Sequence, residues 1–245
     1  MIRFFVAPDQ IADGEVTLNE DDAHHVRVVL QMSPGQSIAI LDGSGTEWDA
    51  VLLTVGKRSA TASLKRASQP QTEPRTRIVV AQALPRMAEK MEQVLQRGTE
   101  IGAHGFRAFS STRSLTHLTG ERQEKRLARW KTIIKTAAEQ SHRVLLPEAS
   151  AVDTFETLIA SAASYDLALL AYEDERDTSL KTALRNIPAP RSVLVIVGPE
   201  SGITPQEAAA ARAASIRSVS LGPRILRTET AAMVAAAQIL YELEG

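Results

Sequence analysis

The hydrophobic pattern of this chain changes near residues 69–74. Before that point, short apolar runs alternate with turn signals such as Pro34-Gly35, a spacing expected of a small β-barrel. After it, continuous apolar runs alternate with amphipathic helical patterns, which is typical of a parallel sheet covered by helices on both faces. The intervening sequence QPQTEP is the best linker candidate. We therefore predict an α/β chain with two domains, residues 1–70 and 74–245.

The expected elements follow from these two patterns. In the first domain we expect one short helix from Asn19 or Asp21 to Leu30, and strands at 3–6, 37–41, 47–53 and 60–64. In the second we expect helices at 85–101, 121–140 and 231–241, and strands at 78–83, 106–109, 167–171, 193–197 and, more weakly, 216–220. Thr204, Pro205 and Glu207 have the order of a capping box with proline at the first helical position, so another helix should begin there.

Composition excludes several classes of protein. The 245 residues are 44% hydrophobic and 23% charged, which is ordinary globular usage. The chain has no cysteine, so disulfides, cysteine nucleophiles, iron–sulfur clusters and cysteine-based zinc sites are excluded. The histidines show no paired metal-ligand spacing, and we expect no metal site.

No apolar run approaches the length of about 18 residues that a membrane-spanning helix needs, and residues 1–10 lack the features of a signal peptide. We therefore expect a cytoplasmic protein with no membrane partner.

The net charge of −1 hides an uneven distribution. Residues 71–147 carry 14 basic and 7 acidic side chains, a net charge of +7, whereas residues 1–70 and 148–245 carry −3 and −5. Such a block points to a polyanionic partner, although a pair of solvated helices explains it equally well. Aromatic residues are only 4% of the chain, which disfavours a stacking platform for single strands and favours folded RNA recognised through shape and phosphates.

Two glycine-containing loops follow predicted strands. Residues 198–207 read GPESGITPQE, and residues 220–230 read SLGPRILRTET. Ligands of open α/β sheets bind beyond the carboxyl ends of the strands, so we expect a small-molecule site at these loops. The phosphate motifs GxxxxGK[ST] and GxGxxG are missing, and the apolar residues and free backbone amides suit an adenine and a sulfonium sugar better than a polyphosphate. Helix caps and tight turns are the alternative explanation of the same glycines.

Motifs along nearly the whole chain carry a resemblance to one family. They are Met-Ile-Arg-Phe-Phe-Val at the start, His24-His25 through Leu30 with Pro34-Gly35, residues 89–92 and 97–102, Thr112-Arg113-Ser114, residues 139–143 with Pro147-Glu148, Gly198-Pro199-Glu200, and residues 221–230. The string at 221–230 is highly specific. By the number and order of these motifs, the chain resembles the RsmE-like 16S ribosomal RNA uridine-N3 methyltransferases of the SPOUT superfamily.

The resemblance implies a PUA-like, RNA-binding β-barrel at residues 1–70 and an α/β trefoil-knot methyltransferase domain at 74–245. It implies a homodimer that uses S-adenosylmethionine to methylate N3 of a uridine in 16S rRNA, uridine 1498 in the usual numbering, within a small-subunit particle. A non-enzymatic RNA-binding or ribosome-assembly protein is one alternative. A ribose 2′-O-methyltransferase of the same superfamily is another, although that branch is rich in asparagine motifs and this chain has only two asparagines. A nucleotide-dependent enzyme of unrelated chemistry is weakened by the missing phosphate motifs.

Site residues follow from the resemblance and from the chemistry of N3 methylation. Arg227 and Glu229 are the first candidates for stabilising the uridine anion and for accepting its proton, and Arg143 with Glu139 is a second set. The donor-binding candidates are Leu170, Gly198, Pro199, Glu200, Gly202, Leu221, Gly222, Ile225, Leu226 and Thr228. The RNA-binding candidates are Arg3, His25, Arg27, Arg86, Lys90, Arg97 and Arg113. Each also has a plain explanation: Glu229 as a helix-N-terminal acid, the leucines as core, and the basic residues as solvated charges.

Two positions depart from the family pattern. Ser201 stands where the family usually has glycine in Gly-Pro-Glu-Gly-Gly. Leu30-Gln31 replaces the usual Leu-Arg, so one candidate for a phosphate contact is absent. Neither departure removes the two ligand loops.

Overall fold

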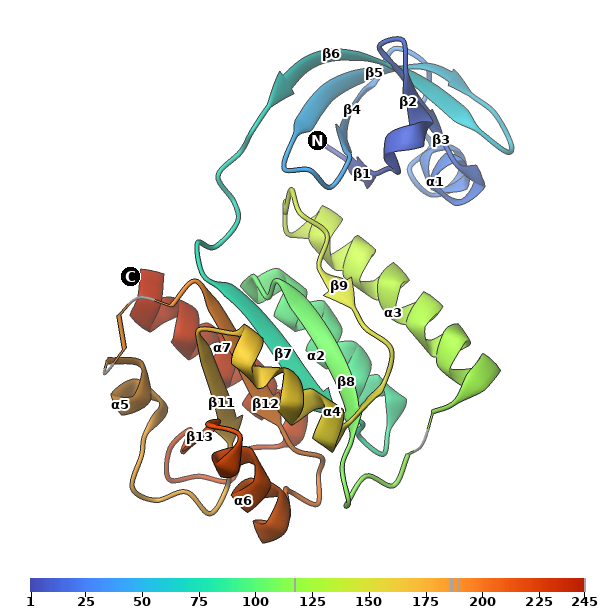
Figure 1. The fold of residues 1–245 in the computed structure, drawn as a ribbon. Coiled ribbons are helices and arrows are strands. Elements are labelled where there is room, and N and C mark those ends of the chain that lie inside the picture. Colours follow the sequence, from blue (N-terminus) through green and yellow to red (C-terminus); the bar gives the residue numbers. More distant parts are fainter. Residues whose placement is uncertain (117, 186, 189, 245) are drawn as a thin grey trace. The chain divides into compact units, whose positions relative to one another are not determined.

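Figure 1 shows the computed structural model, which describes residues 1–116, 118–185, 187–188 and 190–244. The described chain divides into two compact units. The first consists of Met1–Glu73 with Ala138–Leu146, and the second of Pro74–Ala137 with Pro147–Gly245. Residues 138–146 thus group with the first unit, although they lie far beyond the linker candidate at 69–74. No local sequence pattern indicates this grouping.

The first unit is built on one sheet with the strand order β1-β4-β5-β6-β3-β2. β1 and β4 are parallel, and the other neighbours are antiparallel. The strands are β1 (Arg3–Phe5), β2 (Ile11–Ala12), β3 (Glu15–Leu18), β4 (Ser37–Leu41), β5 (Glu47–Val55) and β6 (Ala60–Ser68). β3 alternates exposed and buried residues, and its Val16 and Leu18 pack with Ile38 and Ile40 of β4 in one buried cluster. The strands expected in this unit are therefore confirmed.

The sequence pattern misses the hairpin of β2 and β3. Asp13 and Gly14 close it, with φ of 51° and 77°. Positive φ at both turn residues is the reason for an Asp-Gly pair in hairpins, so a signal for this turn is present in the sequence. The strands have only two and four residues, too few for an alternating pattern to be recognised.

The helix expected from Asn19 or Asp21 to Leu30 begins where the cap predicts. The Asn19 side chain accepts a hydrogen bond of 2.9 Å from the Asp22 amide and starts α1 (Glu20–His24). The chain then continues as a π-helical segment, His25–Val29, in which Val26 is buried. Gln31, one of the two departures from the family pattern, follows with a positive φ of 51° and is exposed to solvent.

The second unit contains a parallel sheet with the strand order β10-β8-β7-β12-β11-β13, and β9 also pairs with β8. Its strands are β7 (Arg77–Ala83), β8 (Gly105–Ser110), β9 (Glu148–Ala149), β10 (Asp153–Thr154), β11 (Leu167–Ala171), β12 (Ser192–Val197) and β13 (Arg217–Val219). Its helices are α2 (Ala88–Ile101), α3 (Gly120–Gln140), α4 (Phe155–Ala160), α5 (Leu180–Arg185), α6 (Pro205–Ala213) and α7 (Thr228–Glu244). The last residues of α3, from Ala138 on, are those that group with the first unit.

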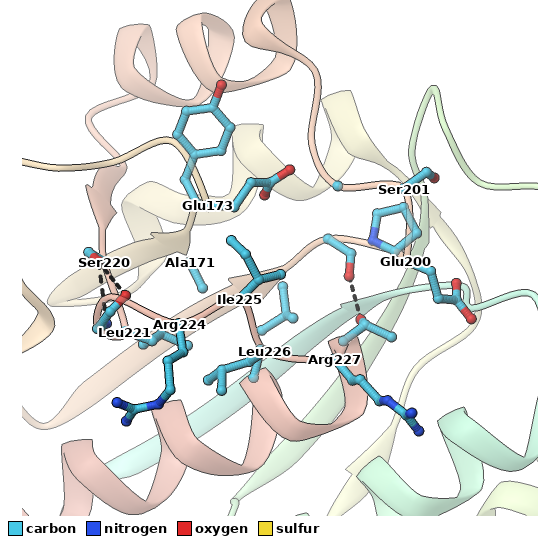
Figure 2. Close-up of a pocket in the computed structure, with 18 of the residues that line it drawn as sticks. Ala171, Glu173, Glu200, Ser201, Ser220, Leu221, Arg224, Ile225, Leu226 and Arg227 are labelled. Atoms are coloured by element: carbon cyan, nitrogen blue, oxygen red, sulfur yellow. Dashed lines mark hydrogen bonds between the residues drawn. The ribbon is translucent and has the colours of Figure 1, made fainter.

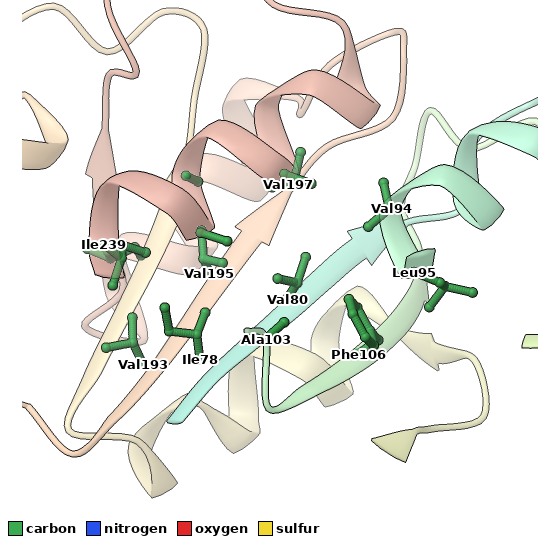
Figure 3. Packing of buried hydrophobic residues seen from close by; sticks show 14 of the residues in the cluster. Ile78, Val80, Val94, Leu95, Ala103, Phe106, Val193, Val195, Val197 and Ile239 are labelled. Atoms are coloured by element: carbon green, nitrogen blue, oxygen red, sulfur yellow. The ribbon is translucent and has the colours of Figure 1, made fainter. Parts of the chain in front are cut away.

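Helices cover both faces of this sheet, as the continuous apolar runs predict (Figure 1). Val193 and Val195 of β12 face a cluster with α2, α3, α5 and α7, and Figure 3 shows them beside Ile239 of α7. Leu194 and Ile196, the residues between, face the opposite cluster with α4 and α6. A strand buried on both faces must be apolar at every position, which is what made β11 and β12 recognisable.

Several boundaries differ from those expected. α2 begins at Ala88 rather than residue 85, and α7 runs from Thr228 to Glu244 rather than from 231 to 241. The sequence pattern misses α4 and α5, because helices of six residues are too short to show a hydrophobic period. It misses β9 and β10 for the same reason, since each has two residues.

Neither a membrane span nor a metal cluster is found in the described part of the chain. No helix there is long and apolar enough to cross a membrane. No group of three or more His, Asp or Glu side chains among these residues is placed to hold a metal ion.

Candidate functional site

A cavity of about 480 Å³ opens beyond the carboxyl ends of three neighbouring strands. Its walls come from the loops that follow β11, β12 and β13, and from the first turn of α7. Open parallel sheets bind ligands at this edge. The volume lies within the range of about 300–1,000 Å³ that is usual for ligand sites.

The loop after β12 requires glycine at position 202. Gly202 has a φ of 72°, and a Cβ there would lie 1.8 Å from Oε1 of Glu173. Its amide donates a hydrogen bond of 3.0 Å to the Pro199 carbonyl and closes a tight turn. The glycine therefore lets the backbone approach a carboxylate in the cavity wall. The capping box of Thr204 and Glu207 then starts α6, which confirms the predicted helix start.

Ser201, where the family pattern has glycine, joins this loop to the loop after β8. Its hydroxyl donates to the Arg113 carbonyl at 2.9 Å, and Arg113 Nη1 donates to the Ser201 carbonyl, also at 2.9 Å. Glu207 adds a further link, because it accepts a hydrogen bond of 2.8 Å from the Thr112 amide. Burial raises the pKa of Glu207, but hydrogen bonds from Thr112 and Thr204 outweigh it and hold that pKa below its usual value.

The loop between β13 and α7 supplies the apolar wall. The Ser220 hydroxyl and Gly222 exchange hydrogen bonds of 3.3 Å, and Gly222 has a φ of 123°. Ile225 is 76% exposed. Figure 2 shows Ile225 with Arg224 and Arg227 directed to opposite sides of it. An apolar side chain kept in solvent at a cavity is available to pack against a ligand.

A buried polar network joins the two loops. The Thr228 hydroxyl donates to the Gly198 carbonyl at 2.5 Å and accepts from Gln82 Nε2 at 2.8 Å. Gln82 is 1% exposed, and its Oε1 has no hydrogen-bond partner among the described residues. Sequence reasoning missed Gln82. The available signal is an amide side chain within an otherwise apolar strand, since buried polar side chains usually have a partner to bind.

Lys90 of α2 lies between two carboxylates. Its Nζ is 3.0 Å from Glu200 Oε1 and 3.7 Å from Glu229 Oε2. The Arg86 amide also donates to Glu200, at 3.2 Å. Burial raises the pKa of Glu200, but hydrogen bonds from its own amide, Lys90 and the Arg86 amide outweigh it and lower that pKa. Glu229 is 7% exposed, and its buried Oε2 has no hydrogen-bond partner in the described chain.

The structure brings together most of the predicted donor-binding residues. Those that line the cavity are Gly198, Pro199, Glu200, Gly202, Leu221, Gly222, Ile225, Leu226 and Thr228, and the catalytic candidate Arg227 lines it with them. Leu170 does not line it. Because residues of β11 alternate between the faces, Leu170 is wholly buried against α4 and α6, and its neighbour Ala171 lines the cavity instead.

The second catalytic set has partners within the first unit. Arg143 Nη2 donates to Glu73 Oε2 at 2.6 Å, and Glu139 Oε1 accepts from the Phe5 amide at 3.0 Å. Neither residue lines the cavity. Burial raises the pKa of Glu73, but Arg143 and the amides of Val144 and Leu145 outweigh it and hold that pKa below its usual value.

The RNA-binding candidates of the second unit fall into two groups. Arg86, Lys90 and Arg113 line a second hollow beside the cavity, and Lys90 lines the cavity as well. Arg97 lies apart on the exposed side of α2, with Nη1 4.0 Å from Met233 Sδ.

The RNA-binding candidates of the first unit differ in their exposure and in their contacts with other side chains. Arg27 is exposed. The His25 ring packs edge-on against Phe4, with the ring centres 6.0 Å apart. Arg3 forms an ion pair with Glu47, and its side chain is only 14% exposed, so its charge is already compensated.

Comparison with known proteins gives the family. A model described as RNA methyltransferase domain matches residues 72–240, and one described as RNA methyltransferase PUA domain matches residues 18–65. Ribosomal RNA small subunit methyltransferase E of Bacillus subtilis is 31% identical, over 100% of this chain and 98% of that protein. The protein of the same name from Synechocystis is 35% identical, over 99% of this chain and 78% of that protein.

Solved structures share the fold. A ribosomal RNA small subunit methyltransferase E from Neisseria gonorrhoeae, bound to S-adenosyl methionine, has a TM-score of 0.87 and 29% identity, over 98% of this chain and 97% of that chain. A putative methyltransferase from Legionella pneumophila, in complex with the cofactor SAM, has a TM-score of 0.89 and 27% identity with the same coverage. The expected α/β methyltransferase fold with an N-terminal PUA domain is confirmed. By its domains and its full-length similarity, the chain belongs to the family of the ribosomal RNA small subunit methyltransferases E.

Proposed function

We propose that this chain transfers a methyl group from S-adenosylmethionine to N3 of a uridine in 16S rRNA, by resemblance uridine 1498. The observation that carries the proposal is the cavity that the two glycine loops form at the carboxyl edge of the parallel sheet. The names of the relatives, which refer to the ribosomal RNA of the small subunit, and the SAM-bound neighbours support it.

The residues of the cavity suit this donor. Leu221 and Leu226 offer apolar surface for the adenine ring, and Gly202 allows the Glu173 carboxylate to lie close to the backbone of the loop. Glu173 places a carboxylate in the wall, where it complements the positive charges of a sulfonium and an amino group. When bound, the donor supplies an electrophilic methyl group, and its transfer to N3 leaves a neutral thioether and releases the N3 proton.

The chain's own residues then have to stabilise an anion and accept a proton. Arg227 is exposed and lines the cavity, so its guanidinium is placed to hold the charge that spreads over N3 and its neighbouring oxygens. Glu229, whose buried Oε2 accepts no hydrogen bond in the described chain and lies 3.7 Å from Lys90 Nζ, is the candidate proton acceptor. The Lys90 ammonium lies between Glu200 and Glu229 and orients both carboxylates.

The wider assembly is proposed from the family resemblance. Residues 1–70 would dock on 16S rRNA and residues 74–245 would carry the transfer, on a small-subunit particle in the cytoplasm. Arg143 and Glu139 would be a second catalytic set, supplied by the other subunit of a homodimer or by a neighbouring helix end.

The proposal is tested by methylation in vitro. The purified chain is incubated with small subunits whose 16S rRNA lacks the modification and with methyl-labelled S-adenosylmethionine, and the RNA nucleosides are analysed by mass spectrometry. We expect label in N3-methyluridine. Label in a 2′-O-methylnucleoside would instead make the chain a ribose methyltransferase. An intact protein that binds RNA but no donor at millimolar concentration would be a non-enzymatic assembly protein.

A further inference from the structure

A second hollow, of about 360 Å³, lies beside the donor cavity. Lys90, Glu200 and Ser201 line both, so these three residues form a common wall. The other residues that line the hollow are Arg86, Met87, Arg113 and Leu115. A molecule in the hollow would therefore meet the donor cavity at this wall.

Positive charge dominates the hollow. The Glu200 carboxylate is already bound by Lys90 Nζ at 3.0 Å and by the Arg86 amide at 3.2 Å, so its charge is compensated. Arg86 and Arg113 are exposed. Arg113 uses Nη1 to hold the Ser201 carbonyl, which leaves the rest of its guanidinium fork for a ligand. Guanidinium groups in this arrangement are typical donors to phosphate.

Two exposed apolar side chains lie among these cations. Met87, just before α2, is 55% exposed, and Leu115, on the loop after β8, is 72% exposed. None of the described residues that line the hollow is aromatic. The polarizable thioether of methionine packs well against an aromatic ring, so Met87 and Leu115 together offer a surface for a flat base without an aromatic partner in the protein.

The loop that carries Arg113 and Leu115 is fixed at several points. The buried hydroxyls of Ser111 and Ser114 lie 3.0 Å apart, and the Ser114 hydroxyl also accepts from the Ser111 amide at 3.1 Å. The Thr116 hydroxyl donates to the Pro85 carbonyl at 3.2 Å. These contacts add to those of Thr112 with Glu207 and of Arg113 with Ser201. The exposed leucine is thus held by a scaffold that is ordered before any ligand arrives, which lowers the entropic cost of binding.

We infer that this hollow is the acceptor subsite, which takes one nucleotide swung out of the RNA, with its base against Met87 and Leu115 and its flanking phosphates on Arg86 and Arg113. The inference rests on the proposed function, because a base must leave its stack to reach a methyl donor. The volume of the hollow fits a nucleotide rather than a helical segment. The combination of cations and apolar surface in the hollow matches a nucleotide rather than a free phosphate or an apolar peptide.

Kinetics of two variants test the inference. Met87→Ala and Leu115→Ala are assayed at saturating donor over a range of RNA concentrations. We expect the KM for RNA to rise by about tenfold in each, as for the loss of a small apolar contact. The affinity for S-adenosylmethionine, measured by calorimetry, should stay at the wild-type value. Tyr241→Ala on α7, whose side chain is 80% exposed and lines neither the donor cavity nor the hollow, is the control and should leave KM unchanged. A wild-type KM in both hollow variants would overturn the inference.

A crosslinking experiment separates this inference from the proposed function. A 16S rRNA fragment transcribed with 4-thiouridine at random positions is irradiated with the wild-type chain, and the crosslinked peptides are identified by mass spectrometry. We expect crosslinks to the peptides that contain Met87 and Leu115. If the wild-type chain crosslinks at these peptides but does not methylate the RNA, the subsite stands and the proposed function is rejected. If the chain methylates the RNA without crosslinks at these peptides, the proposed function stands and the subsite is rejected.

Discussion

Gly202 meets two demands at once, a left-handed backbone and a close approach to Glu173. Gly202→Ala should weaken S-adenosylmethionine binding by about tenfold or more. The new Cβ would strain a backbone with a φ of 72°, and it would lie 1.8 Å from Glu173 Oε1, so that this carboxylate would have to move. Titration calorimetry measures the affinity. Gly14→Ala is the matched control, because Gly14 has a φ of 77° and open space around it. Equal losses of donor affinity in the two variants would contradict the role of Gly202.

Glu229 is the residue to which the proposed mechanism assigns the N3 proton. Glu229→Gln keeps the size of the side chain but removes the proton acceptor, so the single-turnover methylation rate should fall about 10²-fold. Donor affinity and melting temperature serve as controls for an intact site and fold. A rate within about threefold of wild type would leave Glu229 as a helix-N-terminal acid that stabilises the free amides of α7.

Among individual residues, the sequence predicts those site residues that belong to the loops directly after predicted strands. Gly198, Leu221 and Ile225 belong to such strings and line the cavity. The sequence does not predict Gln82 and Glu173, because their importance comes from contacts between elements that are distant in sequence. The sequence pattern assigns Lys90 to RNA alone, and only the fold shows its ammonium beside Glu200 and Glu229.

Elements are predictable here when burial imposes a pattern longer than a few residues. β11 and β12 are apolar at every buried position and could be placed within one residue. The two-residue β9 and β10 and the six-residue α4 and α5 offer no such pattern. Their places are set by the sheet against which they pack, which is information that no local window contains.

The segment 138–146 is the clearest case of an element placed by distant contacts. Glu73 holds it in the first unit through Arg143 Nη2, at 2.6 Å, and through the amides of Val144 and Leu145, at 3.0 and 3.2 Å. No pattern near residue 140 predicts a partner at residue 73, because the partner is a single carboxylate far away in the chain.

This contact gives stability a defined pH dependence. The folded pKa of Glu73 is lowered from 4.5, so its contribution is present above that value and is lost as the pH falls below it, through the folded pKa. Urea unfolding of wild type and Glu73→Gln should therefore show a difference in unfolding free energy at pH 7 that shrinks below pH 4.5. A difference that is the same at both pH values would show that Glu73 acts through packing rather than charge.

For the whole molecule, the net charge of −1 gives a misleading picture of its partners. The excess of +7 in residues 71–147 includes the cations of the second hollow, whereas residues 148–245, at −5, carry most of the donor cavity. The lining of the donor cavity is not itself acidic, because Lys90, Arg176, Arg224 and Arg227 stand there against Glu173 and Glu200. The charge block that points to a polyanionic acceptor is therefore residues 71–147, which supply Arg86 and Arg113 of the second hollow.

This charge block predicts RNA affinity that falls steeply with salt. Arg86→Ala and Arg113→Ala should each reduce the slope of log affinity against log salt concentration by about one, because each removes one phosphate contact. Fluorescence anisotropy with a labelled 16S rRNA fragment measures the slope. Arg217→Ala on β13, an exposed arginine outside the hollow, should leave the slope unchanged. Equal slopes in all three variants would place the phosphate contacts elsewhere.

The transfer of one methyl group to N3 of a uridine in 16S rRNA can be followed in cells that lack the gene, by mass-spectrometric mapping of their 16S rRNA. We expect the loss of a single N3-methyluridine, its return with a wild-type copy, and no return with a Glu229→Gln copy. A methylation pattern that is unchanged by the deletion, or a loss confined to ribose methylation, would contradict the proposed function.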